Sequence, residues 1–131
     1  MDLIQFWFDN EHLWFGATSD DDRYIAETFG GEMKVALFET PKTPKDILKT
    51  ILLLDQVVWH YDRVHGTSYQ KKYNSKAITL SMEAIDICCE DINDMIYTNA
   101  QKCFIMLPLR HSPYLDDHNV ALHYIKKFRK E

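Results

Sequence analysis

The feature that most constrains the fold is one apolar stretch in the middle of the chain, residues 51–63, which reads ILLLDQVVWHYDR. Its apolar residues recur at the three- and four-residue spacing of a helix with one buried face. Read as a helix, the stretch places Asp55 on the same side as Ile51, Leu52 and Trp59, where a core is expected. A carboxylate that faces a core is costly unless it is paired or hydrogen-bonded. The stretch is therefore either a core helix with an internal polar contact or the floor of a site.

Residues on both sides of this stretch predict the ends of a long central helix. Thr43 can cap it, Pro44 suits the first helical position, and Asp46 stands where a capping-box acid belongs. We expect the helix to end near Arg63, before Gly66.

The rest of the chain also predicts helices, because no segment alternates apolar and polar residues with a period of two. We expect Ser19 to cap a helix that Gly30-Gly31 ends, Pro108 to end another, and Ser112-Pro113 to start the last one with a stripe of Leu115, His118, Leu122 and Ile125. The expected helices cover residues 3–8, 19–29, 32–39, 75–88 and 92–107, with loops at 12–16 and 69–73. Short connections between them predict one all-α domain over residues 1–131, an antiparallel array of helical hairpins with about six helices.

Charge and composition exclude several classes of protein. The net charge of −5 gives no reason to expect nucleic-acid binding, apart from Lys71, Lys72 and the basic tail 126–130, and basic residues also suit the end of a helix. The longest uncharged apolar run, residues 51–54, is too short to cross a membrane, and we expect no signal peptide at the N-terminus, because it has no basic region before a long apolar run. Three cysteines, with Cys88 and Cys89 adjacent, suit buried thiols in a reducing compartment. We therefore expect a soluble cytoplasmic protein.

Familiar catalytic and metal-binding motifs are absent from the sequence. His118 and His123 are five residues apart and point in different directions, and neither H-E-x-x-H nor C-x-x-C occurs. The chain also lacks G-x-S-x-G and a glycine-rich phosphate loop. We expect no metal and no cofactor.

A series of short motifs resembles the domain-of-unknown-function 924 family. These are Phe6-Trp7-Phe8, Trp14-Phe15 followed by Asp22, Leu52-Leu53-Leu54-Asp55-Gln56 with Arg63, and Leu107-Pro108-Leu109 followed by His111-Ser112. They span most of the chain in the family's order. The resemblance implies a tetratricopeptide-like, all-helical fold and no established activity. It singles out Asp55, Gln56, Arg63, His111 and Ser112 as the polar residues of a site, with Trp7 and Trp14 as its aromatic walls.

The chain also departs from the family pattern. After Asp55-Gln56 the family usually has Phe-Pro-Arg-Asn, whereas this chain has Val57-Val58-Trp59-His60. The family's C-terminal segment, rich in Arg, Asn and Gly, has no counterpart. The resemblance thus implies a shortened, divergent member, in which any catalytic activity is impaired.

Two functions and one structural alternative follow for the polar residues. The first function is a binding module that holds a peptide or a small polar ligand, an anionic one near Arg63, in a groove lined by Asp55, Trp59, Arg63 and His111. Asp55 and Arg63 lie about 12 Å apart along a helix, so a shared ligand or another helix would have to bridge them. The second function is a hydrolase for a small polar substrate, with Asp55 or His111 as general base. The alternative is that Asp55 and Gln56 only tie two helical hairpins together near His111.

Overall fold

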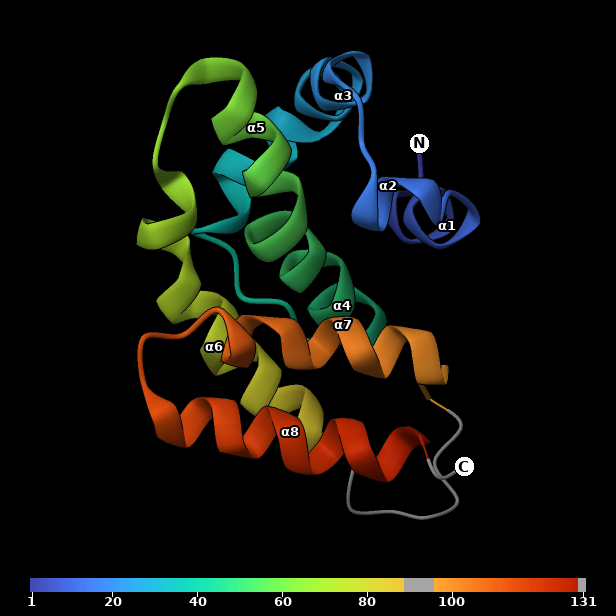
Figure 1. The fold of residues 1–131 in the computed structure, drawn as a ribbon, viewed down its shortest axis with the longest axis vertical. Helices are drawn as coiled ribbons and strands as arrows, with labels where there is room; N and C mark the ends of the chain where they lie inside the picture. Colours follow the sequence, from blue (N-terminus) through green and yellow to red (C-terminus); the bar gives the residue numbers. More distant parts are fainter. Residues whose placement is uncertain (89–95, 130–131) are drawn as a thin grey trace.

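The computed structural model of the chain consists of helices joined by turns (Figure 1). It describes residues 1–88 and 96–129, and every regular element in these ranges is helical. In chain order the elements are α1 (Leu3–Asp9), α2 (His12–Phe15), α3 (Ser19–Ala36), α4 (Pro44–Leu52), η1 (Leu53–Val57), α5 (Val58–His65), α6 (Tyr69–Cys88), α7 (Asn99–Arg110) and α8 (Leu115–Arg129). The all-α prediction is confirmed, whereas the tetratricopeptide-like arrangement of hairpins stays a prediction.

Three predicted features fall, wholly or in part, outside the residues that the structure describes. They are the thiols of Cys88 and Cys89, residues 92–95 of a predicted helix, and the end of the basic tail, which includes the side chain of Arg129 and all of Lys130. The described part of that predicted helix is α7, which starts later, at Asn99, after the cap Thr98. In the described residues, no helix is both long enough and apolar enough to cross a membrane.

The predicted central helix exists, and it contains one wider turn in its middle. The segments α4, η1 and α5, here together called the central helix, follow one another without a break, and Thr43 caps the start through a hydrogen bond from the amide of Asp46. Residues Leu53–Val57 form a π-helix, a rare variant that often marks functional sites. The wider turn shifts the residues that follow it around the helix axis. Asp55 is therefore 1% exposed, while Trp59, predicted on the same buried side, is 38% exposed.

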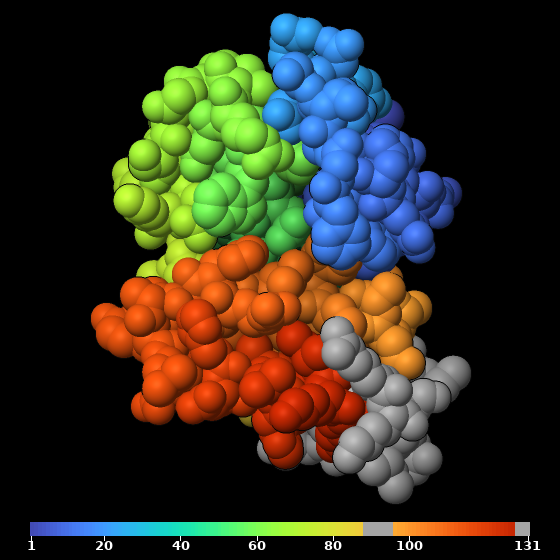
Figure 2. All heavy atoms as spheres, viewed as in Figure 1, coloured from blue at the N-terminus to red at the C-terminus, as the bar shows by residue number. Residues whose placement is uncertain are grey.

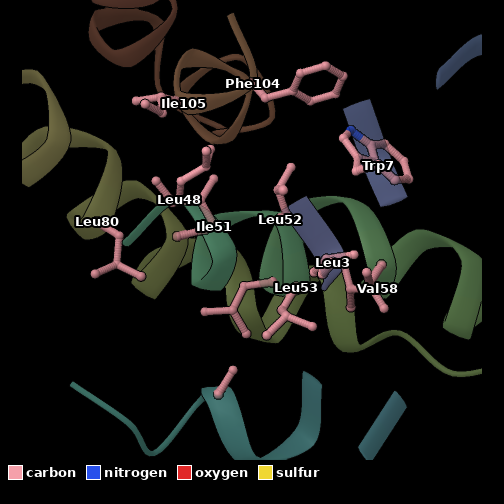
Figure 3. Packing of buried hydrophobic residues seen from close by; sticks show 14 of the residues in the cluster. Leu3, Trp7, Leu48, Ile51, Leu52, Leu53, Val58, Leu80, Phe104 and Ile105 are labelled. Atoms are coloured by element: carbon pink, nitrogen blue, oxygen red, sulfur yellow. The ribbon is translucent and has the colours of Figure 1, made fainter. Parts of the chain in front are cut away.

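The core surrounds this helix. Figure 3 shows Leu48, Ile51 and Leu52 of α4 between α1, α6 and α7, which contribute Leu3, Trp7, Leu80, Phe104 and Ile105. On its other side, α3 packs against η1 and α5. The chain ends with α7 and α8 lying side by side (Figure 1). The central helix is thus enclosed by neighbours, which explains its continuous apolar sequence.

The prediction that Gly30-Gly31 ends a helix is wrong. Helix α3 continues through both residues to Ala36 and includes most of the segment 32–39 that was predicted as separate. Among the described glycines only Gly66 has a positive φ, so Gly30 and Gly31 are ordinary helical residues. The N-cap of α3 is Thr18, which forms a capping box with Asp21, and not the predicted Ser19.

Two predicted loops are also helical. Residues 12–15 form α2, and residues 69–73 form the start of α6 instead of a basic loop before a helix capped near residue 75. The start of α6 depends on Asp62, whose carboxylate accepts the backbone N–H groups of Tyr69 and Gln70, each at 3.0 Å. Asp62 lies in the preceding helix, seven and eight residues before the two amides. A usual N-cap residue stands directly before its helix, so the local sequence does not indicate this cap.

The C-terminal helices begin and end later than predicted. Pro108 lies inside α7, which runs to Arg110, and the side chain of Asn74 donates to the Pro108 carbonyl at 3.2 Å. Helix α8 begins at Leu115, not at Pro113. Its predicted apolar stripe is wrong in part, because Leu115 is 73% exposed and Leu122 is 50% exposed, while Ala121 is fully buried.

The two helical glycines give a matched test of packing. Replacing Gly31 by Ala should stabilise the protein by about 0.5–1 kcal/mol, because Ala is the better helix former and nothing lies within 4 Å of the added Cβ. At Gly30 the added Cβ would lie 3.1 and 3.2 Å from Cδ2 and Cε2 of Tyr61. We expect Gly30→Ala to lose most or all of that gain in urea unfolding. Equal stabilisation by both variants would contradict this packing.

Candidate functional site

Asp55, Gln56 and His111, which the sequence singled out, meet in the structure. Oδ1 of Asp55 accepts a hydrogen bond from Nδ1 of His111 at 2.8 Å, and Oδ2 accepts one from Nε2 of Gln56, also at 2.8 Å. Asp55 comes from the π-helical turn, and His111 follows the last residue of α7. We call Asp55 and His111 the inner pair. It supplies the partner that a buried carboxylate requires.

The inner pair leaves one nitrogen of His111 available for chemistry. Its Nδ1 is committed to Asp55, and among the described residues Nε2 has no hydrogen-bond partner. The hydrogen bond to Asp55 raises the pKa of His111, although burial opposes the shift. The side chain is 30% exposed. A carboxylate that orients an imidazole through Nδ1 and leaves Nε2 open is the arrangement of a general base.

A second polar cluster lies further along the same helix and joins it to α3. Asp22 accepts hydrogen bonds from Nε and Nη2 of Arg63, both at 3.0 Å, and its Oδ1 lies 2.6 Å from Nδ1 of His60. Asp22 and His60 are buried, while the side chain of Arg63 is 51% exposed. We call these three residues the arginine cluster. It gives Arg63 a partner from α3, so this arginine is not bridged to Asp55.

The pKa values in the arginine cluster reflect burial and charge. Burial raises the pKa of Asp22, but the hydrogen bonds from Arg63 and His60 outweigh it, so the pKa falls below its ordinary value. Burial lowers the pKa of His60, and the charge of Arg63 adds to this effect, although Asp22 opposes it. The cluster therefore holds an ionised carboxylate, a guanidinium and a neutral imidazole at neutral pH.

A pocket of about 330 Å³ lies between the N-terminal segment and the central helix. We call it the aromatic pocket. Figure 2 shows the two parts of its wall where residues near 15 (blue) meet those near 60 (green). Its lining residues are Leu13, Trp14, Phe15, Gly16, Ala17, Gln56, Trp59, His60 and Arg63. The pocket thus brings together residues from two distant parts of the sequence.

The predicted site residues divide between this pocket and its surroundings. Gln56, Trp59, Arg63 and Trp14 line it, whereas Asp55 and His111 lie behind Gln56 and Trp59. The ring of Trp59 contacts that of His111 edge-on, with centroids 5.8 Å apart. The inner pair therefore adjoins the pocket through these two residues.

Ser112 and Trp7 lie outside the pocket wall. The hydroxyl of Ser112 donates to Asp117 at 2.6 Å and accepts the amide of Tyr114 at 3.1 Å, which shapes the turn before α8. Trp7 is 1% exposed and stands edge-on to Phe104 (Figure 3). Its carbonyl accepts the indole N–H of Trp14 at 3.1 Å. Trp7 therefore supports the pocket wall from behind.

Sequence reasoning left two members of the site out of the predicted set. Asp22 was assigned to the first turn of a helix and His60 to a departure from the family pattern. Asp22 did belong to the motif series of the family resemblance, and this was the one signal that could have identified it. In the part of the chain that the structure describes, no three His, Cys, Asp or Glu residues are grouped to hold a metal ion.

The described residues form an all-helical protein with a carboxylate–imidazole pair beside a small aromatic pocket. A sequence model of the family described as "Bacterial protein of unknown function (DUF924)" matches residues 3–131. The match covers nearly the whole chain, so the protein belongs to this family, as its motifs predicted. Neither the curated proteins nor the solved structures contain a match.

The inner pair predicts a defined pH dependence of stability. Because the pKa of His111 is raised above its ordinary value of 6.5, the charged pair stabilises the fold fully below pH 6.5 and loses this effect as the pH rises through the raised pKa. His111→Asn keeps a neutral donor for Asp55 and removes the charge. We expect it to lower the free energy of unfolding by about 1 kcal/mol at pH 6, where the lost bond is charge-assisted, and by less at pH 9.

Urea unfolding of both proteins between pH 5.5 and 9 measures this difference. The exposed His123 on α8 provides the control, and His123→Asn should show little change at any pH. A difference for His111→Asn that grows with pH would contradict the assignment of the charged pair.

Proposed function

We propose that the protein binds a small polar molecule in the aromatic pocket. The observation that carries this proposal is the lining itself, in which aromatic rings from two sides accompany three polar groups, those of Gln56, His60 and Arg63. Sites for small molecules typically combine apolar walls with a few placed polar groups. The volume of about 330 Å³ lies at the lower end of such sites, which favours a small molecule over an extended peptide.

The pocket wall supports binding because its side chains are already held in place. Asp55 accepts from Gln56, and Asp22 holds Arg63 through two hydrogen bonds. Trp14 is held by the carbonyl of Trp7 and by an edge contact to Phe104 at 4.9 Å. Side chains that are ordered before binding lose less conformational entropy when a ligand arrives.

The inner pair favours a second candidate function, hydrolysis of a small substrate. His111 has its Nδ1 oriented by Asp55, and its Nε2 remains without a partner among the described residues. In this candidate, Nε2 takes a proton from a water molecule as that water attacks a carbonyl carbon of the substrate. The bond from this carbon to the leaving group then breaks, and Nε2 returns the proton to the leaving group. Gln56 and Trp59 line the pocket and contact the inner pair, so one layer of side chains separates the base from the pocket.

A thermal-shift screen of small metabolites tests the binding proposal. A ligand at 100 times its Kd should stabilise the fold by about 2.7 kcal/mol and raise Tm by several degrees. We expect the shift to disappear in Trp59→Ala and to persist in Phe38→Ala, a control at a ring that is 84% exposed and outside the pocket lining. A shift that is the same in both variants would place the ligand elsewhere.

Hydrolysis of p-nitrophenyl esters tests the second candidate. Loss of a general base typically lowers the rate by about 100-fold or more. We expect this loss in His111→Gln, while the thermal shift caused by a pocket ligand is retained. His123→Gln, which changes an exposed histidine on α8, should leave the rate unchanged. Activity that survives in His111→Gln would exclude the inner pair as the base.

A further inference from the structure

We infer that the aromatic pocket takes a molecule with an oxyanion group, a carboxylate or a phosphate, attached to a flat apolar body. The oxyanion binds at Arg63, and the flat body lies against Trp59 and Phe15. This inference rests on the proposed function, since it names the chemical class of ligand for the same pocket.

The charge of the lining residues favours an oxyanion as ligand. Arg63 is the only Asp, Glu, Lys or Arg among the lining residues, all of which are described, in a protein whose net charge is −5. His60, the other titratable lining residue, is held neutral because burial lowers its pKa. The pocket wall therefore presents one positive charge to a ligand and no negative charge.

The geometry of Arg63 leaves donors for that ligand. Asp22 engages Nε and Nη2, while among the described residues Nη1 has no hydrogen-bond partner. A guanidinium carries five N–H donors in one plane, so two bonds to Asp22 do not exhaust it. The side chain of Arg63 is 51% exposed and lines the pocket, so a ligand can approach its guanidinium. Oxyanions are the acceptors that such donors bind most strongly.

Asp22 acts here as a positioning residue. Its side chain is only 12% exposed, and it holds one edge of the guanidinium from α3, while Nδ1 of His60 lies 2.6 Å from the same carboxylate. A partner of this kind reduces the freedom of a binding side chain. Asp22 also lowers the net positive charge of the cluster, so the anion is recognised by directed hydrogen bonds more than by long-range attraction.

The exposed rings carry the second half of the inference. Phe15 is 95% exposed and Trp59 is 38% exposed, although both are large and apolar. They line the same pocket from different elements, α2 and α5. Exposed aromatic surface of this kind favours binding of a flat apolar group that covers it, and stacked or edge-on rings add an attraction beyond the buried area.

Binding of three matched probes tests the inference. These are phenylacetate, phenyl phosphate and the neutral phenylacetamide, titrated while the indole N–H signal of Trp59 is followed by NMR. We expect one or both anions to bind at least tenfold more tightly than phenylacetamide, and the comparison of the two shows which oxyanion is preferred. Inorganic phosphate alone should bind at least tenfold more weakly than phenyl phosphate. Equal affinity would overturn the role of the flat body.

Variants of Arg63 complete the test. Arg63→Gln should remove the preference for anions, whereas Arg63→Lys, which keeps the charge but loses the planar fork, should retain part of it. Lys49→Gln is the control, because Lys49 pairs with Glu32 at 2.9 Å and lies outside the pocket lining.

Two outcomes separate the inference from the proposed function. If phenylacetamide binds as tightly as both anions, or if Arg63→Gln keeps the preference for anions, the inference is overturned and the binding pocket stands. If Trp59 responds to none of the three probes and to no hit of the metabolite screen, both are overturned.

Discussion

The structure depends on how the buried carboxylate of Asp55 is satisfied. At 1% exposure this group needs partners, and it obtains them from Gln56 in the same helical turn and from His111 beyond the end of α7. The bond to His111 ties the C-terminal end of α7 to the middle of the central helix. This contact therefore constrains the position of α7 as well as the local chemistry. The bond to His111, directly after α7, has the tying role that the structural alternative proposed. The Nε2 of His111, which has no partner among the described residues, adds a chemical possibility.

The central helix contributes one residue to each of two carboxylate–imidazole pairs, and the pKa values of the two histidines shift in opposite directions. The pKa of His111 is raised because its hydrogen bond to Asp55 outweighs its burial, whereas the pKa of His60 is lowered because its burial outweighs its bond to Asp22. The adjacent guanidinium of Arg63 adds to the second shift. The same two residue types therefore give a protonatable base at one position and a neutral imidazole at the other, and the difference arises from exposure and a neighbouring charge.

The aromatic pocket forms where the N-terminal segment closes against the central helix. Trp7 is buried against α5 and α7 and accepts the indole N–H of Trp14, so the start of the chain is anchored before it reaches the pocket wall. The π-helical turn contributes from the other side, since it lets Asp55 face inwards while Gln56 and Trp59 reach the pocket. The chain departs from the family pattern at Trp59 and His60. Trp59 lines the pocket, and His60 contacts the carboxylate of Asp22. The departure from the family pattern is therefore located at the wall of the aromatic pocket.

The sequence by itself determined the features that depend on near neighbours. We could predict the all-helical class and the start of α4 at Thr43-Pro44, because caps and apolar spacing act within a few residues. We could predict the family from its short motifs. It also indicated that Asp55, Gln56 and His111 belong together. The tertiary structure alone decided that α3 continues through Gly30 against Tyr61, that Asp62 starts α6, and that Asp22 holds Arg63 from 41 residues away. Each of these depends on groups that only folding brings together, and no local pattern encodes which of several polar partners a buried side chain will meet.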